Sequence, residues 1–223
     1  MLKGAFVKLG EGLIGPVPNV VVFQYNPEKM TRSLAGLKTA GTGADAASKS
    51  SNPLAQPFDP RETFDLTLEL DATDALEEPD THPVAALTGV ADRIAAIELL
   101  LYPASDKGVI SKVSSLLGGA ALPRDTVSIV LFIWGPGRVL PVRLTSYKVD
   151  ETAFSTTLYP IQATVTVGLT VLTDADFGGA DASLSAGEKL AKRAYLFTRN
   201  QREALALANV ANTAESIVGL LPL

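Results

Sequence analysis

The sequence predicts an α+β protein built on an antiparallel β-sheet or sandwich, flanked by one central and one C-terminal helix. Residues 64–71 alternate strictly between apolar and polar side chains, which is typical of a strand with one face in water. Apolar side chains recur instead at three and four residues over 83–102 and 185–221, the period of a helix. Three further strand-like runs follow one another directly, at 127–134, 139–149 and 161–172. Because strands and helices do not alternate, a parallel sheet is not expected.

The N-terminal part is expected to add two more strands, at residues 2–9 and 20–25. The second run is rich in β-branched and aromatic side chains and stops at Asn26-Pro27. Proline fixes its own φ and disfavours the helical conformation for the residue before it. The chain is therefore expected to turn at this point.

Composition narrows the functional classes. With 223 residues the chain is long enough to form a core without disulfides. It has no cysteine, so thiolate chemistry is excluded. The net charge of −5 comes from 24 acidic and 19 basic residues that are mixed along the chain. A non-specific nucleic-acid binder needs clustered basic side chains, and none is evident. The densest basic stretch, with Lys192, Arg193, Arg199 and Arg202, is expected to form the solvated face of a helix.

Residues 36–61 differ in composition from the rest of the chain. They are rich in Gly, Ala, Ser and Pro and hold few large apolar side chains, so they cannot bury enough surface to offset the entropy of ordering. We therefore expect a mobile loop in the isolated subunit. Long loops of this kind are often ordered by a partner, and this one is a candidate arm that reaches a neighbouring subunit.

No apolar run approaches the roughly 20 residues that cross a bilayer. The N-terminus carries a lysine at position 3 and no long apolar stretch, so a Sec-type signal peptide is not indicated. The expected compartment is the cytoplasm.

The search for catalytic chemistry finds no motif. The single histidine, His82, precedes Pro83 at the predicted helix start, where it or Thr81 is expected to serve as a cap rather than as a general base. The glycines flanking Pro136 lie between two strands, so they indicate a hairpin turn and not a phosphate loop. We expect a protein that is not an enzyme, with no catalytic, cofactor-binding or metal-binding residue.

Acidic residues do cluster after the alternating strand, at Asp71, Asp74, Glu77, Glu78 and Asp80. A hard cation such as calcium takes several oxygen ligands, but the spacing of an EF-hand loop is missing. A solvated acidic linker between strand and helix is the preferred interpretation.

Three segments together resemble one family. Phe23-Gln24-Tyr25-Asn26-Pro27-Glu28 resembles the FxFNPE signature of the tube and baseplate-adaptor proteins of contractile injection systems, the phage-tail-like machines. Residues 64–71 resemble that family's FxLxLxfD strand, and 129–135 resemble its FxWG strand and turn. Residues 141–147 stand where the family has a GxVxSLxxxY strand.

The resemblance covers residues 1–177 and implies a phage tail-tube type of β-barrel or sandwich with a packed central helix. It implies six copies in a ring between the spike-bearing hub and the inner tube, where the ring templates tube assembly. Residues 178–223 form a C-terminal helical extension in place of the LysM module that many relatives carry. The family's GxPxRA motif is replaced by residues 156–163.

The partners that the resemblance implies are further copies of the chain, the inner tube protein and the spike or hub protein, with sheath or baseplate proteins as additional candidates. No cofactor and no nucleic acid are expected, and the particle would assemble in the bacterial cytoplasm. A cap-end ring and a cargo or effector adaptor of the same machine are the alternatives. A chaperone-like binding module and a small hydrolase or lyase remain as other classes.

The interface candidates are the first turn, Tyr25, Asn26, Pro27 and Glu28, and the second turn, Trp134 and Gly135. Trp134 ends a strongly apolar strand, so it is also expected to be buried in the core. Open sheet edges must be paired or covered, and strand addition between copies is one way to pair them.

Overall fold

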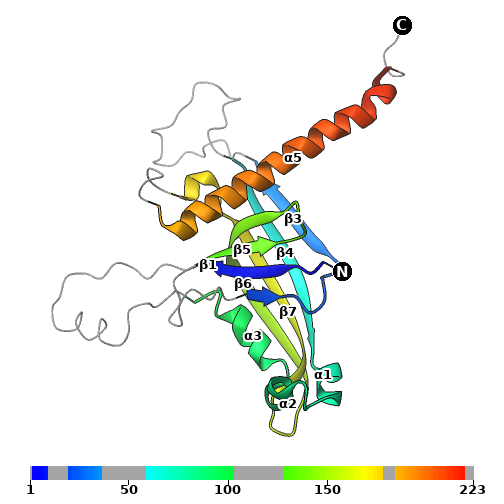
Figure 1. Cartoon of the computed structure of the whole chain (residues 1–223), viewed down its shortest axis with the longest axis vertical. Coiled ribbons are helices and arrows are strands. Elements are labelled where there is room, and N and C mark those ends of the chain that lie inside the picture. The colour runs from blue at the N-terminus through cyan, green and yellow to red at the C-terminus, as the bar shows by residue number, and fades with distance from the viewer. Residues whose placement is uncertain (1, 10–19, 37–58, 103–127, 178–183, 219–223) are drawn as a thin grey trace, which may run out of the picture.

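One antiparallel sheet organises the chain (Figure 1). The computed structural model describes residues 2–9, 20–36, 59–102, 128–177 and 184–218, with the backbone alone for 211, 212 and 214–218. The sheet order is β2-β1-β5-β6-β7-β4-β3. Its strands are β1 Ala5–Leu9, β2 Val20–Val22, β3 Met30–Ala35, β4 Arg61–Asp71, β5 Ile129–Ile133, β6 Val139–Phe154 and β7 Pro160–Val171.

The predicted α+β class with antiparallel strands is confirmed, but the sheet is not closed into a barrel. The strands β2 and β3 stand at the two ends of the order, and in the part of the chain that the structure describes each pairs with a single neighbour. The strand β3 was not predicted because its sequence, MTRSLA, has neither an apolar run nor a clean alternation. All but its first residue are exposed, as is common for an edge strand.

The alternation in β4 is realised as predicted. Phe64, Leu66, Leu68 and Leu70 are buried, whereas Asp65, Thr67 and Glu69 are exposed on the other face. The strand pairs with β7 over nine residues, from Thr63 opposite Thr170 to Asp71 opposite Gln162. The buried face of this pair supplies much of the core.

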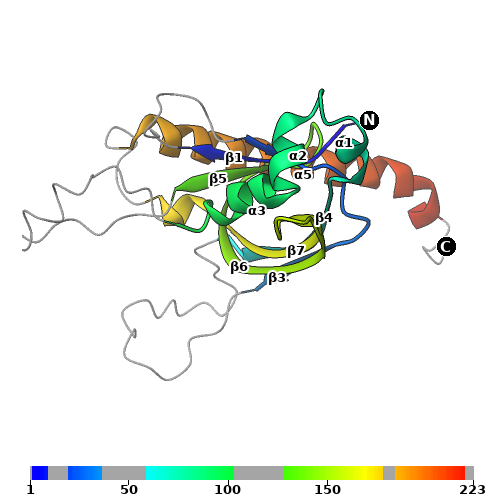
Figure 2. The same cartoon turned by 90° about the horizontal axis from the view of Figure 1, so that it is seen from below.

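The sheet curls so strongly that its ends approach each other, as Figure 2 shows for β4, β7 and β6 around α3. The rings of Phe64 in β4 and Phe132 in β5 lie 5.7 Å apart, although β7 and β6 separate these strands in the sheet. Phe6 from β1 and Phe23 join them, with their own centroids 4.9 Å apart. An aromatic cluster therefore fills one end of the concave side.

The other end of the concave side is filled by α3, Ala91–Glu98, which buries Ile94 and Ile97 there. Two shorter helices precede it, α1 Thr73–Glu77 and α2 Pro83–Thr88. The prediction of one helix over 83–102 is wrong, because the chain breaks between α2 and α3. Gly89 has a φ of +57° there, and a Cβ at this position would stand 2.1 Å from the Pro160 carbonyl oxygen.

The caps of α2 also differ from expectation. His82 occupies the N-cap position, but neither it nor another residue makes a side-chain capping hydrogen bond. The hydroxyl of Thr81 instead donates to the Glu78 carbonyl oxygen. The helix start therefore depends on Pro83, whose fixed φ suits the first helical position.

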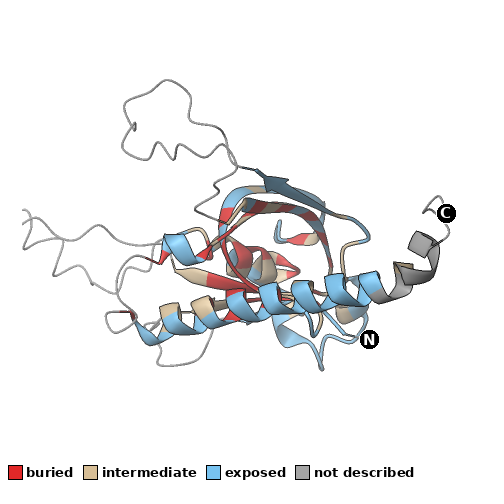
Figure 3. Cartoon of the chain, turned by 90° about the horizontal axis from the view of Figure 1, so that it is seen from above, coloured by how far each residue is buried: buried red, intermediate tan, exposed pale blue. Residues whose placement is uncertain are grey.

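The C-terminal helix, α5 Ala186–Val218, confirms the predicted helical segment. A short 3₁₀ turn, η2 Asp174–Asp176, leads toward it from β7. The first half of α5 buries Ala191, Ala194 and Tyr195. From residue 203 to 210 every side chain is exposed, and the helix projects beyond the sheet (Figure 3).

Most of the predicted mobile loop, residues 37–58, lies outside the described residues, as does the segment 103–127. The ends of the predicted loop are described, and Arg61 already belongs to β4. In the described part of the chain, no helix combines the length and apolar character needed to span a membrane.

Gly89→Ala is expected to lower the free energy of unfolding by about 3 kcal/mol or more, because it combines a positive φ with a backbone clash. Chemical denaturation followed by circular dichroism measures this loss. Gly137→Ala is the matched control, since a Cβ there meets nothing within 4 Å. If the two variants were equally stable, the break between α2 and α3 would not depend on the close approach to Pro160.

Candidate interaction site

The first predicted turn holds the N-terminal segment in place. Asn26 accepts a hydrogen bond from the Gly4 backbone N–H at 2.9 Å, and its amide nitrogen donates to the Leu2 carbonyl oxygen at 2.8 Å. One side chain thus satisfies a backbone donor and a backbone acceptor in the segment just before β1. The turn expected at Asn26-Pro27 is present, between β2 and β3.

The second predicted turn lies against the same segment. Trp134 stacks on Phe132 with ring centroids 6.0 Å apart, and a Cβ at Gly4 would stand 2.9 Å from its ring. Trp134 is half-buried and packs against the core, so its expected burial is realised only in part. The predicted hairpin is present: Gly135 has a φ of +71°, and the Trp134 N–H donates to the Arg138 carbonyl oxygen.

The two predicted turns are therefore neighbours, joined through residues 2–4. Among the predicted interface residues, Tyr25 and Glu28 are exposed and Pro27 is half-buried. A shallow groove of about 340 Å³ separates this turn from the outer face of the sheet. It is lined by Tyr25, Asn26, Pro27, Glu28, Lys29, Thr31, Asp65, Leu66, Thr67, Glu69 and Thr166.

Gln24, inside the same motif, joins two distant parts of the sheet. Its side-chain amide donates to the Asp71 carbonyl oxygen at 2.7 Å and accepts from the Asp71 N–H at 3.0 Å. This is the pattern that a neighbouring strand would offer, supplied by a side chain. Arg93 from α3 donates to the Gln24 carbonyl oxygen as well. Nothing in the sequence motif indicates that Gln24 links the N-terminal strands to the end of β4.

The acidic segment after β4 forms α1 and a turn rather than a plain linker. Asp71 accepts hydrogen bonds from the Thr73 N–H at 2.7 Å and from the Gln162 amide at 2.9 Å. The hydrogen bonds to Thr73, and then that to Gln162, lower the pKa of Asp71 against the opposing effect of its partial burial. Across the described residues, no three acidic or histidine side chains gather in an arrangement that would hold a metal ion.

A buried carboxylate binds arginines from two elements at the opposite end of the molecule. Glu62 in β4 is 2% exposed and accepts hydrogen bonds from Arg32 in β3 and, at 2.9 Å, from Arg202 in α5. Arg138, from the β5–β6 turn, lies over the Phe64 ring at 5.7 Å. Charged side chains from β3, β4, α5 and the β5–β6 turn therefore converge beside the aromatic cluster.

A second acidic residue anchors the adjacent turn of α5. Asp59 accepts hydrogen bonds from the Tyr195 hydroxyl at 2.7 Å and from Arg199 at 3.2 Å. Burial, and then the hydrogen bond and charge of Asp59, raise the pKa of Tyr195. The predicted solvated face holds for Arg199, which is exposed although it pairs with Asp59, whereas Arg202 is only one-third exposed and binds the buried Glu62. Those partners are some 140 residues away in the chain, so the sequence carried no sign of them.

A small cavity lies among these paired side chains. The cavity beside Asp59, Tyr195 and Arg202 has a volume of about 120 Å³, below the roughly 300–1,000 Å³ of typical ligand sites. Its polar groups are already paired with one another. His82 is exposed at the opposite end of the molecule, beside α2.

Comparison with known proteins adds no relative: neither the models of known families nor the curated proteins match this chain.

Asn26→Ala is expected to lower the free energy of unfolding by about 1–2 kcal/mol, because two backbone groups of residues 2–4 lose their partners. Hydrogen exchange should show faster exchange of the Gly4 amide. Glu28→Ala, in the same turn but exposed, is the control and should change stability by less than about 0.5 kcal/mol. Equal protection of Gly4 in both variants would contradict the role of Asn26.

Glu62→Gln is expected to lower the free energy of unfolding by about 2–4 kcal/mol, since two arginines lose their shared carboxylate in a buried setting. Thermal and urea denaturation measure the loss. Asp150→Asn, which loses an exposed pair with Lys148 at 2.6 Å, should cost less than about 0.5 kcal/mol. A Glu62→Gln protein as stable as this control would show that Glu62 does not hold α5 to the sheet.

Proposed function

We propose that this chain is a structural ring subunit of a phage-tail-like contractile injection system. In this role it is an adaptor between the spike or hub and the inner tube, and its ring templates tube assembly. The observation that carries the proposal is the single curled sheet with an edge strand at each end, β2 and β3, whose outer side has no partner among the described residues. The protein acts by assembly and not by catalysis.

Open edges explain how copies join. An edge strand carries backbone N–H and C=O groups without partners, and pairing with another chain satisfies them. Because β2 and β3 are different surfaces, their pairing between copies is head-to-tail, and such a contact closes into a ring when its rotation divides a full turn. A ring of six copies is the expectation that follows from the resemblance of the sequence to tube and adaptor proteins.

The side chains at both edges fit this use. Val20 and Val22 in β2 are 47% and 57% exposed, whereas Val21 between them is buried. At the other edge, Leu34 in β3 is 50% exposed. Exposed apolar side chains on both edges provide surface that a neighbour would remove from water.

The projecting half of α5 provides a further surface. Leu205, Leu207 and Val210 are each at least 60% exposed on a helix that extends past the sheet. This segment stands in the chain where relatives of the resembled family carry a LysM module. In the proposed particle it contacts the tube protein, the hub or a sheath or baseplate protein. The particle assembles in the bacterial cytoplasm.

Proline substitution in β3 tests the edge contact. Backbone N–H groups alternate along a strand, so of the neighbours Ser33 and Leu34 one directs its N–H to β4 and the other to the free edge. Proline removes the donor in either case. One of Ser33→Pro and Leu34→Pro should keep the melting temperature of the unchanged protein but lose oligomers, while the other should melt earlier.

Native mass spectrometry and light scattering give the oligomeric state, and circular dichroism gives the melting temperature. Ser33→Ala and Leu34→Ala are the controls for loss of the side chain alone. A stable proline variant at each position with unchanged oligomers would show that the β3 edge is not the contact.

A further inference from the structure

Three guanidinium groups gather around one carboxylate at the α5 end of the sheet, and two of them bind it. Arg32, Arg138 and Arg202 come from β3, the β5–β6 turn and α5, and Glu62 is the acid between them. Arg32 and Arg202 are each about one-third exposed, so a partner can reach them. We call these three arginines the guanidinium cluster.

Arg138 is the unsatisfied member of the cluster. Its side chain is half-buried over Phe64 and makes neither a hydrogen bond nor an ion pair with any described residue. Burial and the charges of Arg32 and Arg202 lower its pKa from the ordinary value. A guanidinium in such a position is stabilised by an added carboxylate, which it can bind through two parallel hydrogen bonds.

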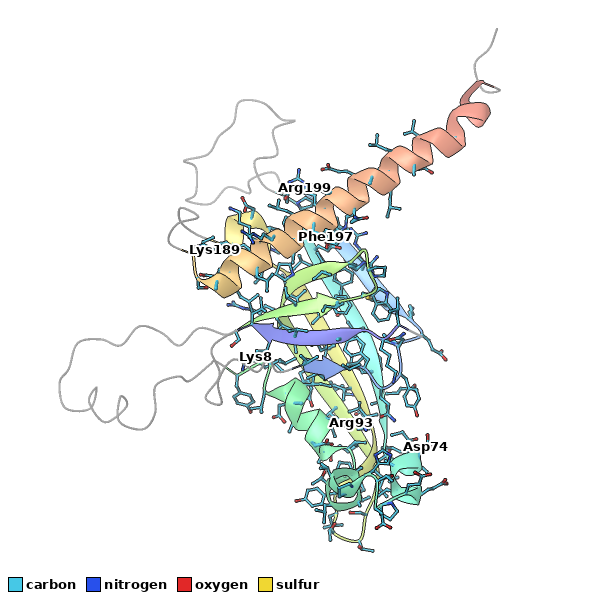
Figure 4. All side chains as sticks on the ribbon, viewed as in Figure 1. Lys8, Asp74, Arg93, Lys189, Phe197 and Arg199 are labelled. Carbon is cyan, nitrogen blue, oxygen red and sulfur yellow. The ribbon has the colours of Figure 1, made fainter. Side chains whose placement is uncertain are left out.

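Unpaired carboxylates lie at the other end of the same molecule. Asp74, Glu77, Glu78 and Asp80 in α1 and the following turn are exposed, and none makes an ion pair with a described residue. We call these four residues the acidic segment. Figure 4 labels Asp74 at one end of the long axis and Arg199, one turn of α5 from Arg202, toward the other. The hydrogen bonds between Thr198 and Val139 keep the Arg138 turn beside this part of α5.

We propose that the guanidinium cluster of one copy binds the acidic segment of a second copy. Opposite charges on opposite ends make this contact head-to-tail, and like-charged ends repel, so the reverse orientation is disfavoured. The contact fixes the direction in which copies add, which strand pairing at the edges alone would leave less strongly defined. This inference rests on the proposed self-assembly and adds a second, separable contact to it.

Cysteine cross-linking tests which surfaces meet. The chain has no cysteine, so introduced thiols are the only ones present. Gly137→Cys beside Arg138 and Glu78→Cys in the acidic segment both lie at open positions. Mild oxidation of a 1:1 mixture of the two single variants should give a disulfide-linked dimer containing one copy of each. Gly137→Cys mixed with Thr164→Cys, on the outer face of β7, should give none.

Charge substitutions added to the cross-linking pair test whether opposite charges bring the two surfaces together. Arg138→Gln should reduce the initial rate of dimer formation about tenfold at low salt, and Glu77→Gln with Asp80→Asn should do the same from the other side. Arg193→Gln, an exposed arginine on α5, is the matched control and should have little effect. The rate should also fall as salt rises to about 0.5 M.

The outcomes separate this inference from the proposed function. Oligomers that form without the 137–78 cross-link, or a cross-link whose rate is unchanged by Arg138→Gln, would overturn the charge contact. The proposed ring would then depend on its strand edges alone. A protein that forms no oligomer at all would overturn both proposals. A cross-link that Arg138→Gln weakens and Arg193→Gln does not is the result the structure predicts.

Discussion

The curl of the sheet is the constraint on which the rest of the structure depends. A seven-stranded antiparallel sheet has a buried face that must be covered, and here the sheet bends until β4 meets β5 across the concave side. The contact of Phe64 with Phe132 and the amide pairing of Gln24 with Asp71 hold the two halves together where strand pairing does not. Only α3 and the first half of α5 are then needed to complete the core.

The curl leaves two kinds of unsatisfied surface, and the proposed assembly would complete both. Within the described residues, the edge strands β2 and β3 have no outer neighbour. The ends of the long axis carry unlike charge, with the guanidinium group of Arg138, which has no ion-pair partner among the described residues, beside α5 and exposed carboxylates on α1 and the turn after it.

The fold could be predicted largely from period-two and period-3.6 patterns. The alternation of β4 and the apolar runs of β5, β6 and β7 reflect burial on one face, which the sequence records directly. The break at Gly89 could not be predicted, because its cause is the carbonyl group of Pro160, 71 positions further on. The strand β3 was missed because an exposed edge leaves no burial pattern.

The candidate site was predictable only in its local part. The first turn was predicted from its motif, and Asn26 does hydrogen-bond the backbone of the segment before β1. The partners of Arg199 and Arg202 could not be predicted, because the helical pattern is the same whether a basic residue faces water or a distant carboxylate. Glu62 appears in the sequence just before the alternating strand, and only the position of α5 shows that it is buried.

The central claim is that copies of this chain join through their sheet edges into a ring at the end of an injection-particle tube. Cryo-electron microscopy of the native particle, with this chain traced in the map, tests it most directly. The account predicts a closed ring between hub and tube, with β2 of one copy beside β3 of the next. A single copy inside the lumen, or a ring in which both edge strands face solvent, would contradict it.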